Sequence, residues 1–128
     1  MATRSSSAPS KLLARYPDDV QALARDATRL IRRLLPGVED HADPAAGIIA
    51  FGYGPGYRGM VCTLILSKTG VKVGLVRGSE LDDPRGLLQG RGRVHRHIQM
   101  KSAADLRRPG VSALIAAAYA AWRERTSG

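Results

Sequence analysis

The chain has almost no cysteine, since Cys62 is the single one among 128 residues. A disulfide within the molecule is therefore excluded, and so is a disulfide-stabilised secreted scaffold. We expect a cytoplasmic protein on this ground. Aromatic residues are also scarce, at 5% of the chain, so the core must be built mainly from Leu, Ile, Val and Ala.

Long apolar runs are missing as well. No stretch approaches the roughly 20 residues that a helix needs to cross a bilayer. The N-terminal residues, MATRSSSAPSK, lack the apolar segment of a secretory signal. Ser, Ala and Pro bury little surface, so we predict a disordered tail over residues 1–14. The remaining span, 15–125, has the length of a single domain.

Acidic residues are few towards the C-terminus. Residues 1–84 contain 11 basic and 9 acidic side chains, whereas residues 85–128 contain 9 basic and 2 acidic ones, within a total net charge of +9. Such an imbalance favours an anionic partner, for example nucleic acid, a phosphorylated ligand or an acidic protein. The alternative is that the arginines only form a well-solvated surface.

Two segments have the apolar spacing of amphipathic helices, residues 18–35 and residues 111–125. Between them, alternating or apolar runs bounded by turn residues predict strands at 38–43, 47–53, 60–67, 71–77 and 93–101. Consecutive hairpins make a mostly antiparallel sheet, and both helices must cover the same face of it. The predicted fold class is therefore α+β, a two-layer α/β sandwich whose other sheet face is open.

Alternation along each strand predicts which side chains face the helices. In the third strand these are Met60, Cys62, Leu64 and Leu66, with Val61 facing out. In the last strand Val94, Arg96, Ile98 and Met100 face the helices. The open face then collects Lys72, Arg93, His95 and His97, joined by Phe51 and Tyr53 from the second strand.

A turn-rich loop, residues 78–92, precedes the last strand. Three leucines, Leu81, Leu87 and Leu88, are expected to anchor it, while its turns are shaped by Asp82, Asp83, Pro84, Gly86, Gly90 and Gly92. Arg96 falls on the apolar side of its strand, where an unpaired charge is costly. We therefore predict that Arg96 pairs with Asp82 or Asp83 and that the loop is structural.

The candidate ligand or partner surface consists of Lys72, Arg93, His95, His97 and Tyr53. His95 and His97 could both face one metal ion, but a zinc or iron site normally needs at least three protein ligands. Basic groups interleaved with Phe51, Tyr53 and Tyr57 on an open sheet would also suit single-stranded nucleic acid, with bases stacking on the aromatic rings.

Catalytic motifs are lacking. The glycine-rich GYGPG segment has no Walker lysine and does not open a helix. Cys62 lies in an apolar strand, and no serine occupies a strand–turn–helix elbow. The residues themselves predict no cofactor and no enzyme.

The segment VGLVRGSELDDPRGLLQGRGRVHRHIQMKSAADL resembles the YdhG-like bacterial domain family. Its loop of the form L-D-P-x-G-L-L-x-G-x-G is matched here by Leu81, Asp83, Pro84, Gly86, Leu87, Leu88, Gly90 and Gly92, and its R-H-I by Arg96, His97 and Ile98. The resemblance extends over roughly residues 15 to 122. That family is similar in fold to frataxin, and some of its members are described as intracellular iron chaperones.

Three hypotheses follow. By resemblance, the protein is a small non-enzymatic binding domain that handles iron or docks on a metal-handling protein through its open sheet face. The second hypothesis is an anion or nucleic-acid binder that uses the basic side chains of that face. The third is an enzyme whose pocket lies between the 78–92 loop and His97.

Overall fold

The structure, a computed structural model, describes residues 7–127. Its helices are α1 (Ser7–Leu13), α2 (Asp18–Leu34), α3 (Ala103–Leu106) and α4 (Val111–Thr126). Its strands are β1 (Glu39–Asp43), β2 (Ile48–Gly52), β3 (Met60–Leu66), β4 (Val71–Leu75) and β5 (Arg96–Met100). Two short 3-10 helices, η1 (Tyr57–Gly59) and η2 (Gly78–Glu80), lie in the connections after β2 and β4.

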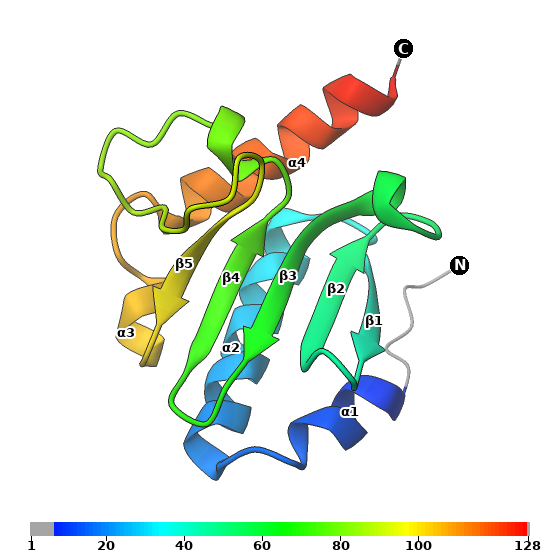
Figure 1. Cartoon of the computed structure of the whole chain (residues 1–128), viewed down its shortest axis with the longest axis vertical. Coiled ribbons are helices and arrows are strands. Elements are labelled where there is room, and N and C mark those ends of the chain that lie inside the picture. The colour runs from blue at the N-terminus through cyan, green and yellow to red at the C-terminus, as the bar shows by residue number, and fades with distance from the viewer. Residues whose placement is uncertain (1–6, 128) are drawn as a thin grey trace.

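The five strands form one antiparallel sheet in the order β1-β2-β3-β4-β5, so each strand pairs with the next along the chain (Figure 1). The β3–β4 hairpin closes tightly, and the Ser67 N–H donates to the Gly70 carbonyl at 3.1 Å. The predicted α+β class and the mostly antiparallel sheet with helices from both ends of the chain are confirmed.

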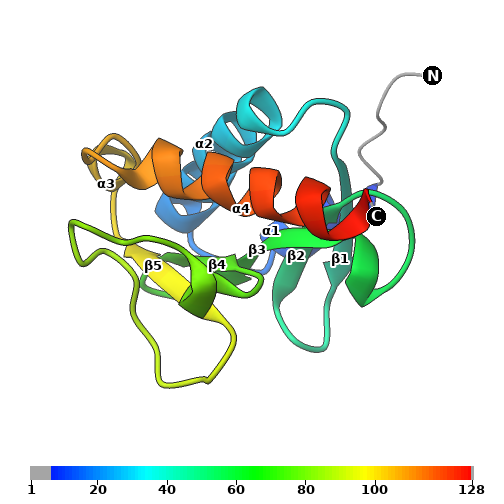
Figure 2. The same ribbon diagram turned by 90° about the horizontal axis from the view of Figure 1, so that it is seen from above.

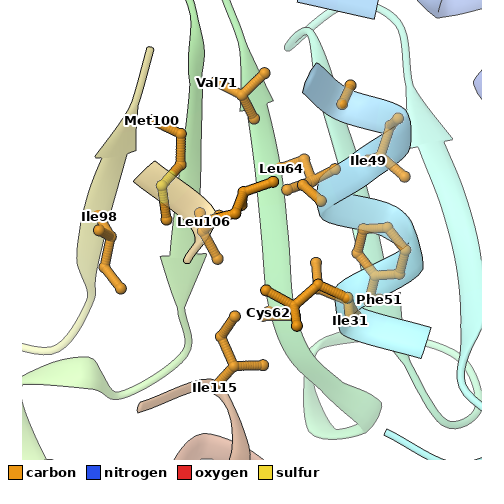
Figure 3. Close-up of a cluster of buried hydrophobic side chains, with 14 of the residues drawn as sticks. Ile31, Ile49, Phe51, Cys62, Leu64, Val71, Ile98, Met100, Leu106 and Ile115 are labelled. Atoms are coloured by element: carbon orange, nitrogen blue, oxygen red, sulfur yellow. The ribbon is translucent and has the colours of Figure 1, made fainter. Parts of the chain in front are cut away.

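Helices α2 and α4 cover the same face of the sheet (Figure 2). Their apolar stripes meet the inward side chains of the strands, where Ile31 of α2, Ile115 of α4 and Leu64 of β3 are fully buried (Figure 3). Burial of such side chains is the main force that holds the two layers together. None of the described helices combines the length and the apolar character that crossing a bilayer requires.

Helix α1 occupies residues for which the sequence predicted disorder. The prediction of a disordered tail over 1–14 is wrong for Ser7–Leu13, and residues 1–6 lie outside the described part of the chain. Leu12 and Leu13 are buried in the core, and α1 packs against β1. Pro9 is compatible with the helix because it lies in the first turn. Because Ser, Ala and Pro dominate the residues before Leu12, the sequence did not indicate that Leu12 and Leu13 attach this segment to the core.

A β-bulge changes the alternation at the start of β3. Phe51 pairs with Cys62, but Gly52 pairs with Met60, so Val61 is an extra residue in the strand. Cys62, Leu64 and Leu66 are buried as predicted, whereas the orientations predicted for Met60 and Val61 are wrong. Val61 belongs to the core and Met60 lines the open face, because an inserted residue reverses the alternation that precedes it.

Phe51 of β2 and Tyr53, which follows β2, lie on the helix side of the sheet, which corrects their predicted place on the open face. Phe51 is completely buried. The ring of Tyr53 stacks on Trp122 of α4 with centroids 4.7 Å apart, and its hydroxyl donates to the Pro36 carbonyl at 2.8 Å. This register buries Ile49 and Phe51 and leaves the smaller Ala50 on the other face, so it removes more apolar area from water.

Strand β5 begins at Arg96, three residues later than predicted. Ile98 and Met100 are buried as expected. Val94 lies before the strand and is 40% exposed, so its predicted inward orientation is wrong. The residues before Arg96 leave the sheet, and alternation therefore does not extend to them.

Arg96 does not form the predicted ion pair with Asp82 or Asp83 anywhere within residues 7–127. Its guanidinium donates instead to the carbonyl oxygens of His95, at 2.9 Å, and of Gly92. Arg96 lies at the end of the sheet beside loop carbonyls, so its charge is solvated by these dipoles without a carboxylate.

Candidate functional site

A row of small residues crosses the open face of the sheet. The strand register aligns His41, Ala50, Thr63, Gly74 and His97, one from each of the five strands. Neighbouring residues in such a row share one face of the sheet. Because Ala50, Thr63 and Gly74 have small side chains, the surface is depressed along the middle of this row. A histidine lies at each end of it.

The open face is hollowed between β3 and β5. This β3–β5 hollow has a volume of about 210 Å³ and is lined by Tyr57, Met60, Thr63, Ile65, Gly74, Leu75, Val76, His95, Arg96 and His97. Pockets for drug-sized ligands usually enclose roughly 300–1,000 Å³. The β3–β5 hollow therefore matches one ring-sized group and not a whole large ligand.

His97 forms part of the wall and is half-buried. Its backbone pairs with Gln89, which donates to the His97 carbonyl at 2.7 Å and accepts from its N–H at 2.9 Å. Burial of the ring lowers the pKa of His97, and the positive charge of Lys72 lowers it further. Its imidazole is therefore neutral at pH 7, with one nitrogen as donor and the other as acceptor.

His95 stands at the mouth of the β3–β5 hollow with both ring nitrogens in contact. Arg77 has a left-handed backbone with φ 56°, and its N–H donates to Nδ1 of His95 at 3.1 Å. The Tyr57 hydroxyl lies 3.4 Å from Nε2 of His95. Because Nδ1 accepts a hydrogen bond, the proton of the neutral ring lies on Nε2. His95 thus positions Tyr57.

Tyr57 separates the β3–β5 hollow from a second one. The second hollow, of about 420 Å³, lies over β1 and β2 and shares Tyr57 and Met60 with the first. Tyr57 is 52% exposed, and its ring tilts 56° from the ring of His95 at a centroid distance of 5.7 Å. A large aromatic ring so exposed between two hollows can stack on a planar ligand.

A basic loop, residues 91–95, projects on the side of the sheet opposite the helices (Figure 2). Arg91 and Arg93 are exposed, and Val94 adds an exposed apolar side chain. The two large apolar residues with high exposure in the described chain, Tyr57 and Val94, therefore both lie near His95.

The preceding loop is held in place by Asp83. Its carboxylate accepts the Leu87 N–H at 2.9 Å and the Leu88 N–H at 2.8 Å. The backbone N–H of Gly86, whose φ is +64°, donates to the Asp83 carbonyl at 3.1 Å. The three predicted leucine anchors, Leu81, Leu87 and Leu88, pack against the core. Asp82 and Pro84 are exposed in the same turn. That the loop is only structural stays a prediction.

The structure brings together part of the predicted ligand surface. His95 and His97 line the β3–β5 hollow, and Arg93 lies on the basic loop. The positive charge of Lys72 lowers the pKa of His97. Tyr53 packs on the other side of the sheet. Whether these residues bind a ligand stays a prediction.

The sequence placed Tyr57 among the aromatic rings of the open sheet, but it did not show the contact of Tyr57 with His95 or the hollow that Thr63 and Gly74 shape. Tyr57 follows the glycine-rich turn, so nothing in its local pattern shows that it reaches His95, which is 38 positions away. A signal did exist for Gly74: a glycine inside a strand often marks a place where another group approaches the backbone closely.

No group of three or more His, Cys, Asp or Glu side chains that could hold a metal ion occurs in the part of the chain that the structure describes. Cys62 is buried, and burial raises the pKa of its thiol to about 12. A thiol with so high a pKa is a poor nucleophile at neutral pH.

Comparison of the chain with known protein families, with curated proteins and with solved structures finds no match.

Proposed function

We propose that the protein is a non-enzymatic, cytoplasmic binding protein that holds single-stranded nucleic acid on the open face of its sheet. The main support for this proposal is that the exposed residue Tyr57 and the basic loop flank the same β3–β5 hollow. Proteins that bind single strands combine aromatic rings, on which bases stack, with a cationic groove for the phosphates. An open sheet surface supplies both in RNA-binding modules.

Charge defines the half of the open face that suits a polyanion. Glu39 and Asp43, at the β1 edge, are exposed and would repel phosphates. Lys72, Arg91 and Arg93 belong to the opposite half, around β4 and β5. A single strand is therefore expected to follow β4 and β5, with its bases over the β3–β5 hollow.

Iron handling, which the YdhG-like resemblance implies, is a separate hypothesis that the histidine geometry does not favour. The two ring nitrogens of His95 already face the Arg77 N–H and the Tyr57 hydroxyl. His97 is then left without a second histidine nitrogen beside it for a shared metal ion, and a metal site usually needs at least three protein ligands.

Fluorescence anisotropy with labelled single strands of about ten nucleotides tests the proposal. The wild type should bind at low salt and lose affinity steeply as salt rises, because binding releases counterions. Changing Arg91→Ser and Arg93→Ser together should weaken binding about tenfold and reduce the salt slope by roughly 1.4, or about 0.7 for each lost phosphate contact.

A matched control is the pair Lys11→Ser and Arg125→Ser, which removes the same charge from exposed positions on α1 and α4. This control should bind nearly as the wild type does. Equal losses in both double variants would show only a net-charge effect, and no binding by the wild type at low salt would refute the proposal.

A further inference from the structure

Three adjacent positions at the floor of the β3–β5 hollow form an unusual arrangement. Gly74 of β4 pairs with Thr63 on one side and with His97 on the other. A Cβ atom placed on Gly74 would lie 2.4 Å from the Thr63 hydroxyl oxygen, so the Thr63 side chain leans over the bare glycine. The floor is thus a flat strip of backbone between two polar side chains.

Both polar side chains have unused hydrogen-bonding capacity. Within residues 7–127, neither the Thr63 hydroxyl nor a ring nitrogen of His97 has a hydrogen-bond partner. A hydroxyl and a neutral imidazole each offer a donor and an acceptor. Facing each other across Gly74, they can hydrogen-bond the mixed donor and acceptor edge of a flat heterocycle that lies between them.

The remaining walls of the hollow are largely apolar. Met60, Ile65 and Val76 contribute to its lining, and Tyr57 closes one side with its ring. Apolar walls with a few convergent polar groups are typical of small-ligand sites. The volume of about 210 Å³ restricts the occupant to one ring system.

We propose that the β3–β5 hollow is a subsite for a single nucleobase, whose edge is bound by Thr63 and His97 over Gly74 and whose phosphate extends towards the basic loop. This inference deepens the proposed function and rests on it for the identity of the ligand. The recognised chemistry is that of the nucleotide, which a single strand or a free mononucleotide can supply.

Three probes separate these sources: a labelled single strand of about ten nucleotides, a nucleoside monophosphate, and inorganic polyphosphate as an anion without a base. Wild type, Gly74→Val and Thr63→Val are compared. Gly74→Val fills the floor and displaces the Thr63 hydroxyl, whereas Thr63→Val removes only the hydroxyl and keeps the side chain's shape. Both substitutions favour strand structure, and the thermal unfolding midpoint of each variant confirms that it folds.

We expect Gly74→Val to weaken single-strand binding about tenfold, which corresponds to the loss of one base contact, with polyphosphate affinity unchanged. Thr63→Val should weaken it less, and by different factors for different homopolymers, because it removes one edge contact. Wild-type affinity in both variants would overturn the subsite while leaving the proposed function intact.

If the wild type binds the mononucleotide, with amide shifts at Thr63, Gly74 and His97, but not the longer strand, the subsite stands and the proposed function falls. If neither nucleotide probe binds, both are refuted.

Discussion

Asp83 is the residue on which the loop before β5 depends most. Its two carboxylate oxygens accept separate backbone N–H groups, at 2.9 Å from Leu87 and 2.8 Å from Leu88. The neighbouring Asp82 is exposed and has no hydrogen bond or ion pair within the described residues. Two adjacent aspartates that look equivalent in sequence therefore have different roles.

This difference predicts unequal effects of two substitutions. Asp83→Ala should lower the free energy of unfolding by about 1–2 kcal/mol, because two partly buried backbone donors lose their acceptor. Asp82→Ala, the matched control, should change it by less than about 0.5 kcal/mol. Urea unfolding measures both, and equal effects would contradict the assigned role of Asp83.

His97 carries a pH signature. Burial and the charge of Lys72 place the pKa of His97 in the folded protein below its ordinary value of about 6.5. Below that pH the unfolded chain takes up a proton more readily than the folded one, so stability falls as the pH drops. The stabilising contribution of neutral His97 is present above about pH 6.5 and is lost below it, down to the folded pKa.

NMR titration of the His97 ring should therefore give a midpoint below that of a blocked histidine peptide in the same buffer. In His97→Gln, the fall in unfolding free energy between about pH 7 and pH 5.5 should be smaller than in the wild type. A His97 midpoint at or above that of the peptide would show that burial does not act on the ring as described.

Helix α1 is an element that the sequence did not predict. Leu12 is 1% exposed and belongs to the core, whereas the adjacent Lys11 is exposed. A disordered tail and a docked helix predict opposite results for these two residues.

Leu12→Ala should cost about 2–5 kcal/mol of unfolding free energy, as is typical for a buried leucine, and Lys11→Ala should cost almost nothing. The measurement is the shift of the urea midpoint at an unchanged slope. If both variants unfold like the wild type, α1 is not docked on β1.

Strand order and strand pairing were predictable because hairpin turns connect strands that are neighbours in sequence. The bulge at Val61 was not predictable, since an inserted residue leaves the apolar run of β3 unbroken and changes only which residues face inward. The orientations predicted for Phe51 of β2 and for Tyr53, just after it, were wrong. This strand is apolar on both faces, so alternation gives no clear register.

For the molecule as a whole, the candidate site could be predicted only in outline. His95 and His97 were identifiable because they accompany arginines in one short segment. Tyr57 and Gly74 join them through tertiary contacts and strand register, which composition and local spacing do not report. The ion pair predicted for Arg96 was also wrong, because the guanidinium meets nearby loop carbonyl oxygens and not a carboxylate, and local sequence does not report such contacts.

The binding surface that we propose is the open sheet face, and not the helical layer. The most direct test is to titrate a single-stranded oligonucleotide of about ten nucleotides into ¹⁵N-labelled protein at low salt and to map the amide shifts. We expect the largest shifts at Tyr57, Thr63, Gly74 and His97, and nearly unchanged amide signals for α2 and α4. Shifts centred on the helices, or none at all, would contradict this expectation.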